Sequence, residues 1–397
     1  MLTPLIFARK YIRIYNRSIL SYDNTAGILI KIKIFKKRMI NTMAQFRKIG
    51  VLTSGGDAPG MNAAIRAVTL SAYAHGVEVV GIMKGYTGLI SGELKELTPR
   101  DVANISGLSG TILYSDRCPE FKTEEGMAKA IKTCRDNHID GIVAIGGDGT
   151  FRGATDLSIR GIPTIGLPGT IDNDITSSDY TIGFDTAMNT VVTCADNLRD
   201  TGESHARCMV MEVMGNGAGD IALNCGLAVG AVAIAIKELP FDEDAAIATI
   251  KAQRAKGQRS FIVMISESMG GEFGEALTKR IMAETGVDSR FVRLGHIVRG
   301  GAPSLRDRLT ATRMGDYAVK LILKGMSNLV VVEQKSELVE VEIQYALMLD
   351  RMYKNKLKDG DLDKFTAEQV ASAKKFCDDK RVEFDGLMDV AKMLASN

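Results

Sequence analysis

Two acids and an amide crowd one short segment of the chain, LPGTIDND (167–174). Phosphoryl transfer to an alcohol requires a carboxylate that accepts the hydroxyl proton, a metal ion and fixed positive charge near the transferring group. In this segment Asp172 can accept the proton, Asp174 can orient a metal ion or its waters, and Thr170 can hold phosphoryl oxygens. An isolated run of this kind more often forms an Asx turn, so the interpretation depends on its surroundings.

A glycine-rich segment, IGGDGTFRG (145–153), precedes it by one unit of the predicted fold. Gly147 and Gly149 leave no side chain to keep a triphosphate away. Asp148 offers the kind of oxygen ligand that Mg²⁺ takes together with phosphate oxygens. Thr150 can bond a phosphate or can simply cap the next helix. Together the two segments indicate a kinase without saying which one.

Two further glycine-rich segments allow more than one interpretation. TSGGDAPGMN (53–62) can present backbone N–H groups to phosphate at a helix N-terminus, or it can be a tight structural turn. The run MGNGAG (214–219) resembles a dinucleotide fingerprint but lacks its last glycine spacing. The P-loop pattern GxxxxGK[ST] is absent from the sequence.

These segments follow short apolar runs that alternate with amphipathic stretches, which is typical of βαβ units. We therefore predict an α/β protein with two doubly wound lobes and mostly parallel sheets. Ligands of such sheets bind beyond the carboxyl ends of the strands, where these motifs lie. The predicted strands span 48–53, 77–82, 141–146, 163–168, 208–213, 231–236, 261–266, 291–296 and 328–333.

Four regions are expected along the chain. Residues 43–180 and 181–350 form the two lobes, and 351–397 is a charged segment of helical period that packs on them. Residues 1–42 carry nine Lys/Arg and one Asp, which leaves a net charge of −6 on the remainder. This basic leader can be a targeting peptide, a membrane or nucleic-acid arm, or an upstream stretch ahead of a start at Met43; we favour the last.

Composition narrows the class of protein. The six cysteines lack CxxC spacing, the four histidines are scattered, and no apolar run reaches 18 residues. We expect a cytoplasmic protein with reduced thiols, without a transition-metal site, a nucleic-acid partner or a membrane partner.

Seven motifs in this order resemble the 6-phosphofructokinase family: TSGGDAPGMNAAIR, GYTGL, IGGDGT, PGTIDNDI, DYTIGFDTA, VMEVMG and LGHIVRGGAPS. The resemblance runs from about Lys48 to Gly325, and the size is that of the short bacterial-type subunit. It implies an ATP-dependent kinase that phosphorylates the 1-hydroxyl of fructose 6-phosphate in the presence of Mg²⁺. It also implies a homotetramer with active sites shared between subunits.

The resemblance further implies roles for individual residues. The first lobe would bind ATP and the second fructose 6-phosphate. Asp172 would be the proton acceptor, Asp148 would hold Mg²⁺, and Arg207 and Arg290 would serve the neighbouring subunit's site. The implied ATP contacts are Gly56, Tyr86, Arg117, Cys118, Gly147, Asp148, Gly149, Thr150 and Gly153, with Arg117 also catalytic. The implied sugar-phosphate contacts are Thr170, Ile171, Asp172, Arg207, Met214, Gly215, Asn216, Glu267, Arg290, His296 and Arg299.

Two glycines favour ATP over pyrophosphate as the donor. Pyrophosphate-dependent members of the family typically carry an Asp at the position of Gly149 and a Lys at that of Gly169. A carboxylate at 149 would repel the α-phosphate of ATP.

Three positions, Asn216, Leu70 and Val232, depart from the family pattern. Asn216 stands where the bacterial pattern has an Arg, and a neutral amide cannot make the same charge-assisted contact. Arg66 and Arg199 match an effector pocket, but Leu70 and Val232 replace other members of that pocket. Alternatives are a pyrophosphate-dependent enzyme, another kinase with a GGDGT turn, or a weakly active regulatory homologue.

Overall fold

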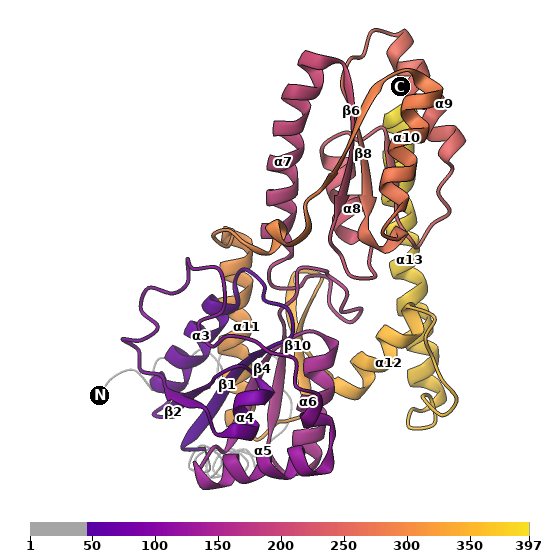
Figure 1. Cartoon of the computed structure of the whole chain (residues 1–397). Helices are drawn as coiled ribbons and strands as arrows, with labels where there is room; N and C mark the ends of the chain where they lie inside the picture. The colour runs from indigo at the N-terminus through magenta and orange to yellow at the C-terminus, as the bar shows by residue number, and fades with distance from the viewer. Residues whose placement is uncertain (1–45, 397) are drawn as a thin grey trace, which may run out of the picture. The chain divides into compact units, whose positions relative to one another are not determined.

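The structure, a computed structural model, describes residues 46–396 of the chain (Figure 1). The expectations about the basic leader and a start at Met43 lie outside these residues. Within them no helix is long and apolar enough to cross a bilayer.

The first lobe is built on a seven-stranded sheet with the order β11-β10-β5-β4-β1-β2-β3. Its strands are β1 (Lys48–Ser54), β2 (Glu78–Ile82), β3 (Leu94–Glu96), β4 (Gly141–Gly146), β5 (Thr164–Pro168), β10 (Leu329–Gln334) and β11 (Glu337–Glu342). The five central strands pair in parallel, and the edge strands β3 and β11 pair antiparallel.

Both faces of this sheet are covered by helices, which explains the near-continuous apolar sequence of β4. Val143 and Ile145 pack into the core cluster shared with α3 (Met61–Ala74) and α11 (Leu305–Leu323). Ile142 and Ala144, which point the opposite way, pack into a second cluster. That cluster includes side chains of α4 (Tyr86–Ser91), α5 (Glu124–Asp136), α6 (Asp148–Ile159) and α12 (Ile343–Tyr353).

The second lobe contains a four-stranded parallel sheet with the order β7-β8-β6-β9. Its strands are β6 (Arg207–Val213), β7 (Ala233–Ala235), β8 (Phe261–Ser266) and β9 (Asp288–Arg293). Its helices are α7 (Phe184–His205), α8 (Asp220–Ala228), α9 (Glu243–Ala255) and α10 (Phe273–Thr285). The helix α13 (Ala367–Ser396), at the yellow end of the ribbon in Figure 1, packs on α8, on β7 and on α12.

The prediction of an α/β fold with mostly parallel sheets is confirmed. The predicted strand at 291–296 is misplaced, because β9 begins at Asp288 and ends at Arg293. Gly295 then has a positive φ of 51° and opens the short 3-10 helix η3 (Gly295–Arg299). The strands β3 and β11 were not predicted.

The expected division at 180 and 350 also differs from the structure. Residues 305–342 belong to the first lobe, since β10 pairs with β5 and α11 packs on α3. Gly315 makes that packing close, because a Cβ at this position would lie 2.8 Å from the Cβ of Ala67. The chain therefore enters the second lobe after β5 and returns with α11.

Candidate functional site

The glycine-rich turn after β4 is open at two of its glycines and packed at the third. A Cβ at Gly147 or Gly149 would meet no atom within 4 Å, whereas one at Gly146 would lie 2.3 Å from the carbonyl oxygen of Ser54. Gly147 is the N-cap of α6. The N-terminus of this helix, which carries partial positive charge, is therefore presented at an open surface that an anion can approach.

Thr150 ties this turn to the end of β1 rather than capping α6. Its hydroxyl donates to the Ser54 carbonyl oxygen at 3.1 Å, and its own carbonyl accepts from the Tyr86 hydroxyl at 2.6 Å. The Tyr86 ring is buried, stacks on Phe121 at 4.0 Å between centroids, and lies against Gly153. Tyr86 and Gly153 thus lie beneath the turn and support it.

The loop after β1 lies beside this turn and receives an arginine from η3. A Cβ at Gly56 would lie 3.2 Å from Nη2 of Arg299. The segment at 115–118 also borders the loop, because the Ser115 hydroxyl donates to the carbonyl of Gly55. Within that segment Arg117 is exposed and Cys118 is half-buried.

Asp148 is the residue that best fits a metal ion. Its carboxylate is half-exposed in the first turn of α6 and pairs with Arg152 at 2.7 Å, an exposed pair of small stabilising value. Between residues 46 and 396 no group of three or more His, Cys, Asp or Glu side chains could hold a metal ion. Asp148 therefore suits Mg²⁺ bound mainly by phosphate oxygens and water.

Asp172 has one satisfied and one unsatisfied carboxylate oxygen. Oδ2 accepts from the Thr170 hydroxyl at 3.2 Å, and the Asp172 N–H donates to that same hydroxyl oxygen at 3.2 Å. Oδ1 is buried and has no hydrogen-bond partner among the residues that the structure describes. Buried acceptors are normally paired, so this oxygen, which follows the end of β5, is an acceptor that a ligand or a water can satisfy. The neighbouring Ile171 side chain is buried in the core.

The surroundings of Asp172 raise its pKa to about 6. Burial is the main cause because it disfavours the charged form, and the nearby carboxylate of Asp174 adds to it. The hydroxyl of Thr170 and the guanidinium of Arg299 act in the opposite direction, and Glu267 raises the pKa slightly. A carboxylate whose pKa lies this close to neutrality is well suited to accept a proton.

Glu267 and Arg299, which come from the second lobe, are the other two charged residues that act on Asp172. The Glu267 carboxylate, in the 3-10 helix η2 (Glu267–Met269), accepts from the N–H groups of Gly215 at 3.1 Å and Asn216 at 2.7 Å. It therefore fixes the turn that follows β6 and the half-buried Met214. Asn216 has a φ of 57°, a left-handed conformation that Asn adopts more readily than Arg. Nε of Arg299 is buried and lacks a partner among residues 46–396.

Asp174 is not free. Its carboxylate lies 3.2 Å from Nζ of Lys354, which follows α12. Near it are two more acids, the buried Asp350 and the partly buried Asp220, and desolvation raises the pKa of each to about 6. The roles of Lys354, Asp220 and Asp350 could not be predicted from the sequence, because nothing local connects them with the segment 167–174.

Arg207 and Arg290 are not brought to Asp172 within this chain. Both pair with Asp288, at 2.8 and 2.5 Å, at the amino ends of β6 and β9. The turn after β6 lies at the opposite end of that sheet, roughly 20 Å away at about 3.3 Å per residue. His296 is exposed in η3.

The predicted effector residues lie on different helices. Arg66 is on α3, and its Nε is buried without a partner among the described residues. Arg199 is on α7, and its guanidinium donates to the carbonyl of Val229. Leu70 and Val232 pack against apolar cores.

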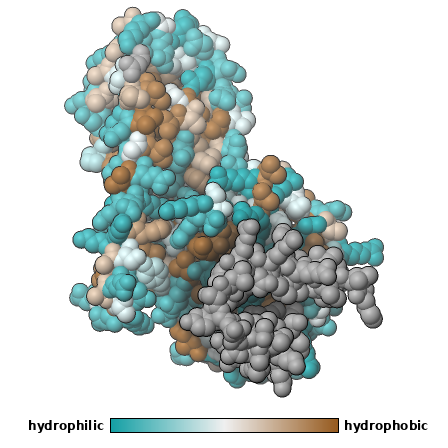
Figure 2. All heavy atoms as spheres, turned by 180° about the vertical axis from the view of Figure 1, so that it is seen from behind, coloured by the Kyte–Doolittle hydropathy of each residue, from teal (hydrophilic) through white to brown (hydrophobic). Residues whose placement is uncertain are grey.

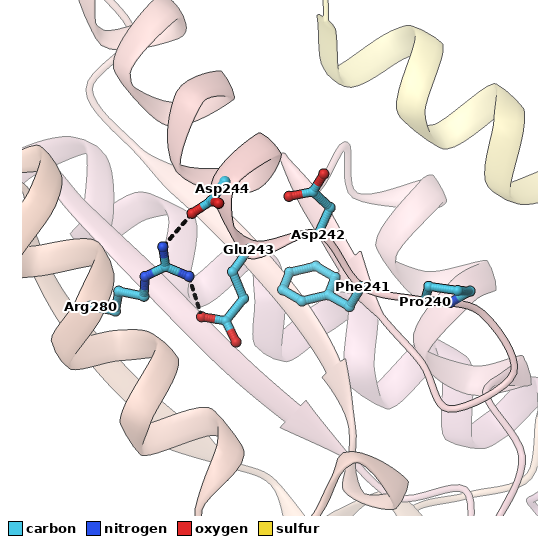
Figure 3. Close-up of a pocket in the computed structure, with 6 residues that line it drawn as sticks. All are labelled: Pro240, Phe241, Asp242, Glu243, Asp244 and Arg280. Carbon is cyan, nitrogen blue, oxygen red and sulfur yellow. Dashed lines mark hydrogen bonds and ion pairs between the residues drawn. The ribbon is translucent and has the colours of Figure 1, made fainter.

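A surface hollow of about 420 Å³ lies elsewhere, beside the start of α9 (Figure 3). Arg280 there points toward Glu243 and Asp244 and pairs with both. None of the predicted site residues lines this hollow, and its arginine is already neutralised. It therefore plays no part in the candidate site.

Residues 48–322 match the family model described as phosphofructokinase. The chain belongs to the phosphofructokinase family. The matched residues include both glycine-rich loops, the segment 167–174 and the arginines discussed above. The predicted family and fold are thereby confirmed.

Similar proteins come from several bacteria. The chain is 48% identical over 313 residues to an ATP-dependent 6-phosphofructokinase of Clostridium novyi, which covers 79% of this chain and 98% of that protein. It is 50% identical over 299 residues to the ATP-dependent 6-phosphofructokinase of Bacillus subtilis, covering 75% and 92%. These identities extend over most of this chain and most of each relative. They place this protein among the kinases, a class of transferase.

Solved structures agree on the fold. Phosphofructokinase from Saccharomyces cerevisiae aligns with a TM-score of 0.73 and 28% identity, covering 83% of this chain and 50% of that chain. The chain of the present protein thus spans about half the length of the yeast chain. A pyrophosphate-dependent phosphofructokinase from Marinobacter aquaeolei aligns with a TM-score of 0.67 at 22% identity, covering 75% and 83%, and shows the fold alone.

Proposed function

We propose that this phosphofructokinase transfers the γ-phosphoryl group of ATP to the 1-hydroxyl of fructose 6-phosphate, giving fructose 1,6-bisphosphate and ADP. The bacterial relatives that cover most of their own length with this chain are named as ATP-dependent 6-phosphofructokinases. The observation that carries the proposal is the buried, unpartnered Oδ1 of Asp172.

Asp172 is the proton acceptor. The 1-hydroxyl of the sugar donates to a carboxylate oxygen of Asp172 and passes its proton there as its own oxygen attacks the γ-phosphorus. The bond between that phosphorus and the β,γ-bridging oxygen breaks, and ADP leaves with the bond's electron pair. The raised pKa of Asp172 supports this role, because a stronger base accepts the proton more readily.

The first lobe binds ATP. Backbone groups of the turn from Gly147 to Thr150 and of the loop at Gly56 face the phosphates, with Arg117 and Cys118 at the border of the site. Asp148 would hold Mg²⁺, which when bound offsets the negative charge of the phosphate oxygens. The open space at Gly147 and Gly149 supports this assignment.

The second lobe binds fructose 6-phosphate. Met214, Gly215 and Asn216 form the turn that faces the sugar, Glu267 fixes that turn, and Arg299 and His296 come from η3. Glu267 is held by two backbone N–H groups, which supports a positioned carboxylate for a sugar hydroxyl. Arg299, next to Gly56, contributes positive charge where the two substrates meet.

Arg207 and Arg290 grip the 6-phosphate in the site of a neighbouring subunit, and the enzyme is a homotetramer in the cytoplasm. Their distance from Asp172 within one chain supports this division of the site. Apolar side chains exposed on α11 and η3 include Leu305, Leu309 and Ile297, and Figure 2 shows apolar patches on both lobes of the face seen from behind. Sedimentation of the purified protein would test the oligomeric state.

ATP rather than pyrophosphate is the donor. A Cβ at Gly169 would lie 2.9 Å from Cγ2 of Ile145 and 3.1 Å from Cε of Met61, which leaves little room for the lysine of pyrophosphate-dependent members. The open position at Gly149 leaves the approach of an α-phosphate free of a carboxylate.

One assay tests the reaction and its base together. Fructose 1,6-bisphosphate formation is measured with Mg·ATP and with pyrophosphate, for the wild type, for Asp172→Asn and for the exposed control Asp196→Asn. We expect activity with ATP only, and a loss of roughly 10²–10⁴-fold in kcat for Asp172→Asn, the usual contribution of a general base. Asp196→Asn should match the wild type.

Activity with pyrophosphate alone would overturn the donor assignment. Near-normal turnover by Asp172→Asn would overturn the role of Asp172 while leaving the reaction itself in place.

A further inference from the structure

The backbone that follows Asp172 is held from the C-terminal end of the chain. Nζ of Lys354 donates to the carbonyl oxygen of Asp174 at 2.9 Å and pairs with its carboxylate at 3.2 Å. Both side chains are largely buried, with 26% and 13% of their surface exposed. An ion pair that is shielded from water in this way is screened less than a surface pair.

Two more side chains form hydrogen bonds with the backbone of the same segment. Asp350, one helical turn before Lys354 on α12, accepts from the Thr176 N–H at 2.6 Å. Lys380 of α13 donates to the carbonyl oxygens of Thr176 at 3.2 Å and Ser178 at 3.0 Å. Because residues 175–178 are buried outside any strand or helix, their backbone groups depend on such partners. We call Asp350, Lys354 and Lys380 the C-terminal clamp.

The segment between Asp172 and the clamp is itself conformationally restricted. Asn173 has a left-handed φ of 53°, and its Nδ2 donates to Oδ1 of Asp220 at 3.2 Å. Asp172 is thus held by Thr170 on one side and by the fixed segment 173–178 on the other. Movement of that segment would move the carboxylate that has to meet the sugar hydroxyl.

We propose that the C-terminal clamp is part of the active site, with Lys354 as a positioning residue that holds Asp172 in place through Asp174. The inference rests on the proposed function, because it assigns the positioned carboxylate to proton transfer. The clamp lies beyond residue 322, where the match to the family model ends.

Lys354→Met removes the charge and both donated bonds while keeping the length of the side chain. We expect kcat to fall by roughly 10- to 100-fold, the usual effect of a small misplacement of a catalytic group, while the KM values for ATP and fructose 6-phosphate change little. Lys354→Arg, which keeps the charge, should recover most of the loss. Lys356→Met, an exposed lysine two residues away, is the matched control and should behave as the wild type.

Hydrogen exchange of the free protein gives a readout that does not depend on activity. In Lys354→Met the amides of 174–178 should exchange faster than in the wild type, while those of β6 in the other lobe should not. Unchanged exchange at 174–178 would overturn the clamp. Faster exchange in both places would mean a general loss of stability and would equally count against it.

Kinetics decide the rest of the inference. If Lys354→Met keeps the wild-type kcat, or if only its KM values change, Lys354 does not position the base. If the wild type itself fails to phosphorylate fructose 6-phosphate, the proposed function falls, and the catalytic part of the clamp falls with it. Exchange at 174–178 would still establish whether the clamp holds the segment.

Discussion

Two loops leave neighbouring parallel strands of the same sheet, yet they are held in different ways. The turn after β4 is fixed by the adjoining strand β1 of the same sheet, through the packing of Gly146 on Ser54 and the bond from Thr150 to the Ser54 carbonyl. The segment after β5 is held by side chains from far along the chain, of which Lys354 is 180 residues away from Asp174.

The difference follows from what each loop has to present. A turn that offers backbone N–H groups to phosphate needs glycines and a helix start, and both are encoded locally. A loop that presents a carboxylate of raised pKa needs burial and nearby charges. Those surroundings can come only from other parts of the fold, here from α12, α13 and the second lobe.

Disturbing the packing of the turn after β4 on the end of β1 should have the largest effect. Gly146→Ala places a Cβ 2.3 Å from the Ser54 carbonyl oxygen, so the two strand ends have to separate. We expect a loss of about 1–3 kcal/mol in the free energy of unfolding, as for other overpacked sites. Thermal or denaturant unfolding measures it.

Gly149→Ala is the matched control for that change. Its Cβ meets no atom within 4 Å, and Ala loses less conformational entropy than Gly on folding. The variant should be as stable as the wild type or slightly more so. Equal destabilisation by both substitutions would mean that the turn is not fixed by its packing on Ser54.

The remote surroundings of Asp172 should appear in the pH dependence of kcat/KM. A base must be ionised to accept a proton, so activity should fall as the pH decreases through about 6. Asp174→Asn removes a carboxylate that raises the pKa of Asp172 and leaves the positive charge of Lys354 with one acidic partner fewer. Both effects lower the pKa of Asp172, and the acidic limb should therefore move to lower pH.

The shift is read from the shape of the pH profile of kcat/KM. The maximum of the profile is not compared, because Asp174→Asn also disturbs the clamp. Profiles normalised to their maxima, with Asp196→Asn as the control, isolate the shift. A limb that stays in place or moves to higher pH would show that Asp174 does not influence the titrating group.

The sequence predicted what is encoded locally. The strand at 141–146 and the open turn after it could be foreseen, because a buried parallel strand is apolar throughout and a phosphate turn is rich in glycine. The strand β9 was misplaced because it lies at the edge of its sheet and carries Asp288, Arg290 and Arg293 among its six residues. An apolar run was therefore a poor guide to where it begins.

The clamp could not be foreseen for a different reason. Lys354 stands in the charged run RMYKNK (351–356), which has the composition of a solvated surface. Only the folded chain shows that its ammonium group is largely buried against Asp174. Pairing over such a separation in sequence leaves no local pattern, so the partners of Asp172 had to come from the structure.

The smallest expected effect tests how much the single side-chain bond adds to the packing of the turn on β1. Thr150→Val keeps the shape of the side chain and removes the hydroxyl that donates to the Ser54 carbonyl. We expect a loss of about 1 kcal/mol in the free energy of unfolding, the usual net value of one hydrogen bond. Thr249→Val, whose hydroxyl donates to the Ala245 carbonyl at an exposed position of α9, should cost less. If the two variants lose the same amount, the turn is held by its backbone packing alone, and the contrast with the remotely held segment after β5 becomes sharper.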